Sequence, residues 1–475
     1  MLPITPALDA ESKEPLFIQL YNFLKSEIQS NHIAPNSKLP SQRKLANNLN
    51  VSRNTVDAAY QQLISEGYIR SEARRGIFVV EIKNDLLLSG FPKIDSNRSN
   101  ILMNQNQEEE KTPEQEIYDF KYGDIDLVHF PFKVWRQINM KALNVEQASL
   151  LLYGDPQGEI ELRKHISRYL FQSRGVECSE EQIVIGAGTQ YLIGLLCNMI
   201  GRNFVYGIEE PGYDRARLIL KDYGKRVAPI PLDNQGLNVS ELIRSDVKAV
   251  YVTPSHQYPT GTIMPVSRRL DLINWARETD GYIIEDDYDS EFRYESKPIP
   301  SLQSLDCYGN VIYLGTFAKS LIPSLRITYL VLPSKLLSIY KEKFWGYKQT
   351  VSRIHQHTLN LFIESGDWLK HLNRVRNIYR KRHHELLEAI QMNMKDRVRI
   401  IGSGSGLHLL LEVNNGMSEN QLIASAKEMG VVIYPVSPFY EIPPSQEFPK
   451  VLLGFAGLDE NRIREGIKIL NKAWF

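Results

Sequence analysis

Hydrophobic positions in the first 80 residues follow helical spacing and then strand spacing. Residues 16–28 carry apolar side chains at intervals of three and four, which predicts an amphipathic helix. Shorter helical patterns follow Ser41, which is a suitable N-cap, and Ser52, which is another. Alternating segments at 68–70 and 77–80 then predict two short strands joined by a turn at Arg74, Arg75 and Gly76. Three helices followed by a hairpin predict a winged helix-turn-helix over residues 1–82.

Residues 83–116 change character. Asn, Gln, Ser, Asp and Glu dominate this stretch, which has too little apolar surface to bury. We therefore interpret it as a polar linker between two blocks that fold separately.

Residues 117–475 alternate between apolar strand-like runs, at 183–185, 250–252, 282–284 and 311–314, and helical patterns. Such alternation predicts an α/β domain with a mostly parallel sheet. From about residue 345 the pattern turns helical, and strand-like runs return at 406–412 and 451–456. We interpret residues 345–475 as a smaller α+β subdomain.

Composition narrows the classes of function. The 475 residues carry 56 basic and 56 acidic side chains, so no global field draws the chain to nucleic acid or to a membrane. The three cysteines argue against a disulfide framework or a zinc site and fit a reducing cytosol, and we predict no metal. The first residues do not have the pattern of a signal peptide, and the longest apolar stretch, near 191–201, is too short to span a bilayer. We expect a cytoplasmic protein with no membrane partner.

Basic residues nevertheless gather locally between positions 36 and 76. Seven of them, Lys38, Arg43, Lys44, Arg53, Arg70, Arg74 and Arg75, stand against three acidic ones. Such a patch is what phosphate contacts require. The alternative is a protein-interaction module with an ordinary solvated face.

The start of the third helix is the predicted base-reading segment. Ser52, Arg53, Asn54 and Thr55 lie there, and the first residues of such a helix reach base edges in the major groove. Arg53 could bind guanine bidentately, while Ser41 and Arg43 suit phosphate. Arg74, Arg75 and Gly76 would form the wing tip. Residues 39–46 and 51–56 closely resemble the GntR winged-helix family, which implies double-stranded promoter DNA as the partner.

The segment Gly315 to Arg326 places Lys319 in a tight turn of small residues, with Arg326 seven positions on. A lysine that forms a Schiff base needs a lowered pKa, and a nearby arginine can supply a fixed cation or hold a phosphate bidentately. The alternative is a surface lysine in a loop. The segment resembles the lysine region of fold-type I aminotransferases, which bind pyridoxal 5′-phosphate (PLP).

Other residues at predicted strand ends extend this resemblance. Asp286 and Tyr288 follow the strand at 282–284, where buried acids at the carboxyl edge of a parallel sheet meet ligands. The turn around Gly188 opens a helix, and backbone N–H groups at a helix start cradle phosphate. The alternative for the acids is that Asp286 and Asp287 lie in a solvated loop. The alternative for the Gly188 segment is an ordinary turn between a strand and a helix. The resemblance implies a full set of cofactor-binding residues: Lys319 for the aldehyde, Asp286 for the pyridine nitrogen, Tyr288 for the ring oxygen, Tyr213 on the ring face, Gly188, Thr189, Gln190, Thr316 and Arg326 for the phosphate, and Tyr153 from the partner of a dimer.

A GntR-type DNA-binding domain (the reader, residues 1–82) joined to an aminotransferase-like domain resembles the MocR subfamily of bacterial regulators, with GabR-like and PdxR-like members. The resemblance implies a fold-type I domain, PLP as cofactor and a head-to-tail homodimer. Two positions depart from it. Gln257 and Tyr258 replace the asparagine of the usual Asn-Pro-Thr-Gly, and Gly457 stands where GabR-like members carry an arginine that grips an amino-acid carboxylate. Arg215 could substitute for that arginine.

These departures lead to a hypothesis about the effector. We expect a transcriptional regulator that senses PLP through an aldimine at Lys319, with an aminotransferase-like fold used for sensing and no catalytic residues. One alternative senses an amino acid or D-amino acid through the external aldimine. Another is an active aminotransferase with a DNA-binding module, and a third is a DNA-binding protein that has lost the cofactor.

Overall fold

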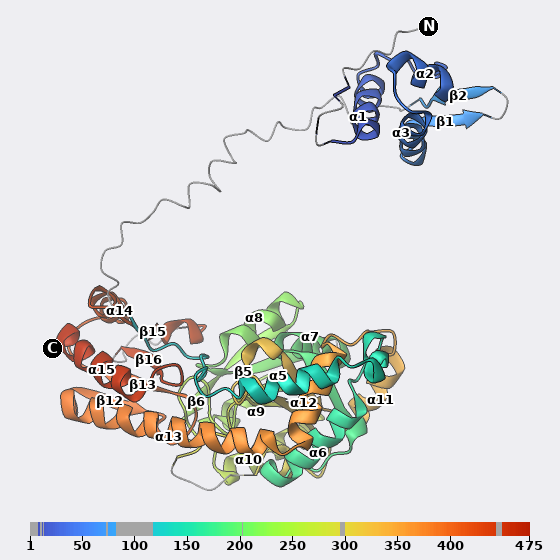
Figure 1. Cartoon of the computed structure of the whole chain (residues 1–475). Helices are drawn as coiled ribbons and strands as arrows, with labels where there is room; N and C mark the ends of the chain where they lie inside the picture. The colour runs from blue at the N-terminus through green and yellow to red at the C-terminus, as the bar shows by residue number, and fades with distance from the viewer. Residues whose placement is uncertain are drawn as a thin grey trace. The chain divides into compact units, whose positions relative to one another are not determined.

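The structure is a computed structural model that describes residues 8–9, 12, 14–72, 75–81, 117–201, 203–294, 300–442 and 449–475. The chain divides into two compact units, Met1–Thr112 and Pro113–Phe475 (Figure 1). The expected linker at 83–116 and the wing residue Arg74 lie outside the described residues.

The N-terminal unit is a winged helix-turn-helix, as the hydrophobic pattern predicted. Helices α1 (Leu16–Gln29), α2 (Gln42–Leu49) and α3 (Arg53–Ser65) are followed by the antiparallel strands β1 (Ile69–Glu72) and β2 (Gly76–Val79). Their apolar faces share one core that includes Leu20, Leu24, Leu45, Val56 and Tyr60.

Two serines determine where the second and third helices begin. The Ser41 hydroxyl accepts a hydrogen bond from the Lys44 backbone N–H at 3.3 Å, and Ser52 accepts one from Thr55 at 3.1 Å. An N-cap of this kind satisfies a backbone donor that has no partner in the helix. The start of α3 is thus set locally by Ser52.

The second unit is built on an eight-stranded sheet in the order β4-β11-β10-β9-β8-β5-β6-β7. Strands β6, β5, β8, β9 and β10 pair in parallel, while β11 runs antiparallel to both β10 and β4. The strands span Ile183–Ala187 (β4), Val205–Glu210 (β5), Arg226–Asp233 (β6), Gly236–Leu237 (β7), Val247–Val252 (β8), Tyr282–Asp287 (β9), Val311–Thr316 (β10) and Ile327–Val331 (β11). The mostly parallel α/β prediction is confirmed.

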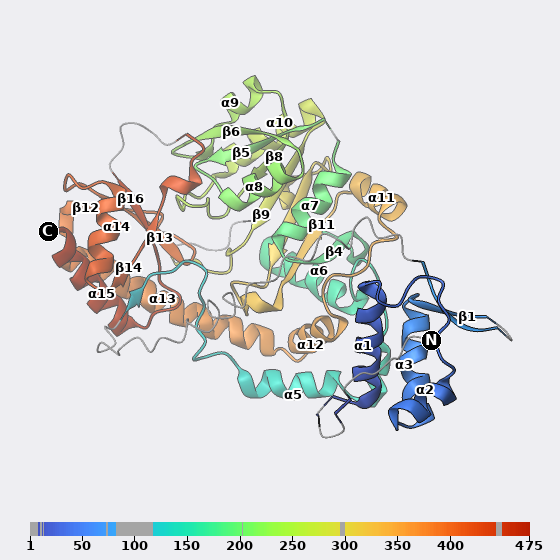
Figure 2. The ribbon, with the colours of Figure 1, turned by 90° about the horizontal axis from the view of Figure 1, so that it is seen from above.

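Helices cover both faces of this sheet, which explains why its strands are apolar on both sides. On β9, Ile284 packs into the cluster formed with α7, α8 and α11, whereas Ile283 packs against α9 and α10. These and the remaining large helices can be followed in Figure 2 and span Phe132–Ala142 (α5), Ile160–Arg174 (α6), Thr189–Met199 (α7), Asp214–Asp222 (α8), Val239–Arg244 (α9), Val266–Thr279 (α10), Ser334–Lys343 (α11) and Arg353–Glu364 (α12).

The long helix α13 (Asp367–Asn393) leads into a smaller α+β part. This smaller part has an antiparallel sheet in the order β12-β13-β16-β15. The strands span Val398–Ile401 (β12), His408–Val413 (β13), Lys450–Gly454 (β16) and Tyr434–Pro435 (β15), and the helices α14 (Glu419–Glu428) and α15 (Glu460–Trp474) cover the sheet. The short strand β14 (Val431–Val432) pairs in parallel with β3 (Tyr118–Asp119), a contact across more than 300 residues. The C-terminal part therefore includes residues from the start of the second unit.

Among the described residues, every helix is too short or too polar to cross a lipid bilayer. The three cysteines are all free, with Cys197 buried and Cys307 exposed.

Candidate cofactor site and candidate nucleic-acid interface

The carboxyl end of β9 places Asp286 in the interior. The side chain is only 5% exposed, and its Oδ2 accepts a hydrogen bond from the Tyr251 hydroxyl on the neighbouring strand β8. Its Oδ1 is buried without a hydrogen-bond partner among the described residues. Burial raises the pKa of Asp286 to about 7, against the lowering effect of the Tyr251 hydrogen bond. A proton donor that reaches Oδ1 would satisfy this oxygen.

The adjacent acids on β9 have partners elsewhere, so the alternative of a solvated acidic loop is wrong. Asp287 pairs with Arg174 at 2.6 Å, and although burial opposes it, this guanidinium holds the pKa of Asp287 below its ordinary value. Glu285 accepts the backbone N–H groups of Leu302 and Gln303 at 2.7 and 2.8 Å.

Lys319 lies in the turn after β10 and is partly buried. Its Nζ is 4.0 Å from the centre of the Tyr122 ring. Desolvation lowers the pKa of Lys319 to about 8; the charges of Asp289 and Asp124 oppose this, and that of Arg215 adds to it. A larger share of neutral amine than an exposed lysine has is what a nucleophilic lysine requires.

The start of α7 and the turn before β11 lie side by side, and we refer to Gly188 and Arg326 as the predicted phosphate cup. Gly188 has a φ of 93°, and a Cβ built there would lie 2.1 Å from Nη2 of Arg326. Arg326 also donates to the Ala187 carbonyl at 3.3 Å. Antiparallel pairing places the first residue of β11, Ile327, beside Ala187, and brings Thr316 opposite Thr328. The predicted phosphate-binding residues Gly188, Thr189, Gln190, Thr316 and Arg326 therefore meet at one edge of the sheet.

Aromatic rings line the next part of the site. Tyr213 stacks on Tyr251 with ring centres 6.4 Å apart and meets Tyr258 edge-on at 5.7 Å. The Tyr288 hydroxyl donates to the His256 carbonyl at 2.8 Å and lies 3.0 Å from Nδ1 of the same residue. These contacts bring Tyr213 and Tyr288 into one cluster of tyrosines around Tyr258.

The two departures noted in the sequence have structural consequences. The Gln257 amide donates to the Pro211 carbonyl at 2.9 Å and its carbonyl accepts from the Thr260 hydroxyl at 2.6 Å, so this side chain holds two loops together. A Cβ at Gly457 would lie 3.0 Å from Cβ of Asp124, so an acidic residue occupies the space beside that glycine. Arg215 is exposed.

Sequence reasoning missed Tyr122, Tyr251, His256, Asp289 and His408. The sequence did contain a signal for Tyr251. Side chains on a strand alternate between the two faces of the sheet, and the strand of Tyr251 lies beside the one that carries Asp286. Tyr122 and His408 come from segments far from Lys319 in the chain, and no local pattern marks them.

Gln190 and Arg326 are exposed among the predicted cofactor residues, and Tyr153 also lies on the surface of its own chain. It is 87% exposed, and Lys348 lies 5.3 Å from the centre of its ring. The neighbouring Leu151 and Leu152 are exposed as well.

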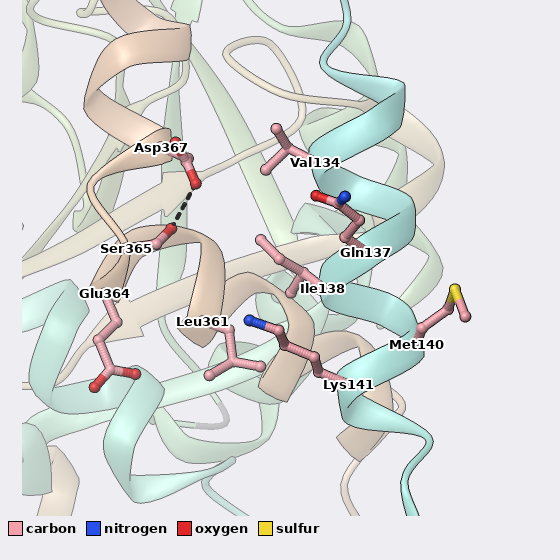
Figure 3. Close-up of a pocket in the computed structure, with 9 residues that line it drawn as sticks. All are labelled: Val134, Gln137, Ile138, Met140, Lys141, Leu361, Glu364, Ser365 and Asp367. Atoms are coloured by element: carbon pink, nitrogen blue, oxygen red, sulfur yellow. Dashed lines mark hydrogen bonds between the residues drawn. The ribbon is translucent and has the colours of Figure 1, made fainter.

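A groove between α5 and α12 also lies on this unit (Figure 3), lined by Val134, Gln137, Ile138, Met140, Lys141, Leu361, Glu364, Ser365 and Asp367.

In the N-terminal unit, Arg53 and Asn54 are exposed at the start of α3, and Arg43 is exposed on α2. Ser52 and Thr55 hold each other through their hydroxyls at 2.8 Å. The acids of this region are engaged, because Asp57 accepts from Gln42 and Glu66 pairs with Lys25 at 2.8 Å.

The described part of the wing contains Arg75 and Gly76. Arg75 pairs with Glu72 at 2.6 Å. Gly76 has a φ of 118°, and the side chain of Lys38 passes over it, since a Cβ there would lie 2.7 Å from Lys38 Cε. The glycine thus admits a second cation to the wing.

Comparisons with known proteins match both units. Residues 116–470 match the family described as aminotransferase class I and II, and residues 18–79 match the bacterial regulatory proteins of the gntR family. The HTH-type transcriptional regulator YdeL of Bacillus subtilis is 46% identical over 100% of both chains. The probable rhizopine catabolism regulatory protein MocR of Rhizobium meliloti is 33% identical over 98% of this chain and 95% of its own.

Two further similarities bear on chemistry. The pyridoxine biosynthesis transcriptional regulator PdxR of Corynebacterium glutamicum is 29% identical over 98% of this chain and 96% of its own. The α-aminoadipate aminotransferase LysN of Thermus thermophilus, solved with N-(5′-phosphopyridoxyl)-L-leucine, is 25% identical with a TM-score of 0.66, over 75% of this chain and 92% of its own.

Proposed function

We propose that this chain, which belongs to the MocR subfamily of GntR-type regulators with an aminotransferase class I and II domain, is a transcriptional regulator whose effector is PLP. The N-terminal unit would bind double-stranded promoter DNA, and the second unit would bind the cofactor. The protein would therefore act in the cytoplasm, where bacterial promoter DNA lies.

The exposed start of α3 supports the DNA-binding role. Arg53, held at the first turn by the Ser52 cap, would read a base edge in the major groove, with Asn54 beside it. Arg43 and Ser41 at the start of α2 would contact phosphate. The second wing cation, Lys38 over Gly76, would add to the electrostatic contact.

Residues of the second unit fit PLP by three observations. The buried Oδ1 of Asp286 has no partner among the described residues and could accept from a protonated pyridine nitrogen. The Gly188 turn and Arg326 offer backbone N–H groups and a guanidinium to a phosphate. Lys319 has a pKa of about 8, so its amine is available to an aldehyde.

PLP, when bound, supplies an aldehyde that an amine can attack and a ring that withdraws electrons. Asp286 would hold a proton at the ring nitrogen, and Tyr213 would cover one face of the ring. The Tyr288 hydroxyl would turn from the His256 carbonyl, its present acceptor, to the ring oxygen. Lys319 would attack in its neutral form, which burial favours.

The absence of an arginine at position 457 supports PLP rather than an amino acid as the effector. Gly457 packs beside Asp124, an exposed acid that pairs with Lys121 at 3.7 Å, and this glycine offers no guanidinium to the carboxylate of an amino acid. A lost charged hydrogen bond costs about 1.5–3 kcal/mol of binding. Genes of vitamin B6 supply would then be the natural targets, as the name of the pyridoxine biosynthesis regulator PdxR also suggests. An amino acid held by Arg215 is the second candidate for the effector.

Exposed apolar side chains support self-association, for which we propose a head-to-tail homodimer. Val128, Phe132, Val145, Leu151 and Leu152 are between 63% and 87% exposed. Large exposed apolar patches mark association surfaces. In such a dimer, Tyr153 would leave the surface and reach the partner's cofactor.

The observation that carries the proposal is that Lys319, Asp286 and the Gly188–Arg326 pair follow or border neighbouring strands of one sheet, in a chain that also has a winged helix-turn-helix. The test is a DNA-binding titration on the region upstream of its own gene, with and without PLP. PLP should change the affinity of the wild type and leave that of Lys319→Ala unchanged. Lys335→Ala, which removes an exposed lysine paired with Asp280, is the control and should respond as wild type. An equal response of Lys319→Ala would refute PLP sensing through this lysine.

An active aminotransferase remains the second candidate function, favoured by the retention of Lys319 and Asp286. Incubation of the purified protein with PLP, an amino acid and a keto acid tests it. Turnover that Lys319→Ala abolishes would establish an enzyme.

A further inference from the structure

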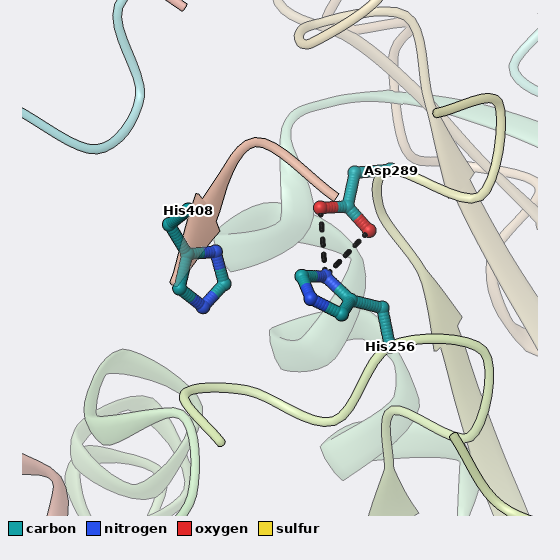
Figure 4. A group of neighbouring side chains, drawn as sticks. All are labelled: His256, Asp289 and His408. Atoms are coloured by element: carbon teal, nitrogen blue, oxygen red, sulfur yellow. Dashed lines mark hydrogen bonds and ion pairs between the residues drawn. The ribbon is translucent and has the colours of Figure 1, made fainter. Parts of the chain in front are cut away.

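Beside the candidate cofactor site, His256, Asp289 and His408 form a buried cluster (Figure 4). His256 lies in the segment after β8, Asp289 follows β9, and His408 begins β13. Each is about 1% exposed, and one possible ligand atom from each lies within 4.8 Å of the other two. The proposed cofactor chemistry gives none of these three side chains a role.

The hydrogen bonds fix which nitrogen of each imidazole carries the proton. Nε2 of His408 lies 3.0 Å from the Pro259 carbonyl, which can only accept, so this nitrogen donates. Nδ1 of His256 lies 3.0 Å from Oδ2 of Asp289 and therefore donates to the carboxylate. In the neutral rings, Nδ1 of His408 and Nε2 of His256 then carry lone pairs.

Both of these nitrogens are buried without a hydrogen-bond partner among the described residues. One such nitrogen alone is ordinary, since His371 also donates from Nε2 to the Ser320 carbonyl and leaves Nδ1 without a partner. His256 and His408 differ because they lie together, with ring centres 4.9 Å apart. Two buried lone pairs in one place can be satisfied together by one metal ion or by a water molecule that donates to both.

We propose that Nε2 of His256 and Nδ1 of His408 bind a divalent transition-metal ion of the Zn²⁺ class, with Asp289 as the outer partner that orients His256. Metal-binding histidines characteristically donate their other N–H to a carboxylate or a backbone carbonyl, which is the arrangement of both rings. Imidazole nitrogen is a preferred ligand of zinc. Two nitrogens on a tetrahedral ion lie about 3.3 Å apart, and the structure already places one possible ligand atom of each residue within 4.8 Å of the others.

The ion would connect two parts of the second unit. His256 belongs to a loop of the large sheet, whereas His408 belongs to the smaller C-terminal sheet. The Tyr288 hydroxyl, 3.0 Å from Nδ1 of His256, links the same cluster to the candidate cofactor site. A bound ion would thus hold the smaller sheet against the loop that borders the cofactor.

The experiment is a Zn²⁺ titration of untagged full-length protein, stripped with a chelator and free of PLP and DNA, by equilibrium dialysis. We expect about one ion per chain. His256→Asn and His408→Asn should each weaken binding by at least about 100-fold, and Asp289→Asn by about 10- to 100-fold. His371→Asn removes a buried histidine of the same hydrogen-bonding pattern outside the cluster and should bind as wild type.

Two results would overturn the proposal: no saturable binding by the wild type, or binding that survives both His256→Asn and His408→Asn. The first would mean that water satisfies the two lone pairs. Should these variants not fold, Co²⁺ added to the wild type decides the matter. Visible ligand-field bands of nitrogen-coordinated Co²⁺ support the site, and a spectrum identical to that of free Co²⁺ refutes it.

Discussion

Asp286→Asn should stabilise the cofactor-free protein and weaken cofactor binding at the same time. Asp286 is buried, keeps its hydrogen bond from Tyr251, and has an Oδ1 without a partner among the described residues. Asparagine has nearly the same shape and can still accept from Tyr251. The substitution therefore removes the charge and adds two amide N–H donors.

The gain in stability comes from the pKa of this carboxyl, which burial raises from 3.8 to about 7. A raised pKa means that the folded protein binds the proton more tightly than the unfolded chain, so stability falls as pH rises from about 4 to about 7. At about 1.36 kcal/mol per pH unit, the ionised carboxylate costs about 4 kcal/mol above pH 7. Asparagine avoids this cost but leaves its amide N–H groups unsatisfied, at about 1–3 kcal/mol. The net gain at pH 8 is about 1–3 kcal/mol.

Below about pH 4 the carboxyl is neutral in both states, and only the amide penalty remains. The variant should then be less stable than wild type, so the difference in unfolding free energy changes sign between the two pH values. The affinity for PLP changes in the opposite direction at pH 8, because the same substitution weakens binding while it stabilises the cofactor-free protein. Loss of a hydrogen bond between a carboxylate and a protonated ring nitrogen costs about 1.5–3 kcal/mol, which weakens PLP binding about 10- to 150-fold.

Urea denaturation at several pH values measures the first effect, and a PLP titration followed by absorbance measures the second. Asp287→Asn is the matched control, because it breaks the buried pair with Arg174 and should lower stability without a selective loss of PLP affinity. If Asp286→Asn binds PLP as tightly as wild type, or is less stable at every pH, the role assigned to Asp286 is wrong.

Further predictions concern the amine, the phosphate cup and the reader. PLP capture should rise about tenfold between pH 7 and pH 9, because Lys319 has a pKa of about 8 and its neutral fraction grows in this range; a rate independent of pH would contradict this. Gly188→Ala should reduce PLP affinity at least about tenfold, since a Cβ would lie 2.1 Å from Nη2 of Arg326, and unchanged binding would exclude the cup. In DNA titrations, Arg53→Ala should remove sequence preference, whereas Arg43→Ala should weaken binding to all sequences and reduce the salt slope by about one. Intact specificity in Arg53→Ala would show that α3 is not the reading helix.

The site was only partly predictable. The edge of the sheet that gathers Asp286, Thr316 and the Gly188 turn follows from strand alternation, because parallel strands end on the same side. The solvated alternative for Asp286 and Asp287 could not be excluded beforehand, since burial depends on which helices cover the sheet. The roles of these residues toward PLP stay predictions until the cofactor is measured.

The sequence by itself determined the elements and their order. Serine caps, turn residues and hydrophobic periods act between residues a few positions apart, so Ser41, Ser52 and the apolar strands set local structure wherever they stand. Only the tertiary structure decided that Tyr122 lies under Lys319, that β3 joins β14, and that His256, Asp289 and His408 meet. These contacts join segments more than 30, and up to more than 300, residues apart. They depend on how whole layers pack, and no periodic pattern in the chain records them.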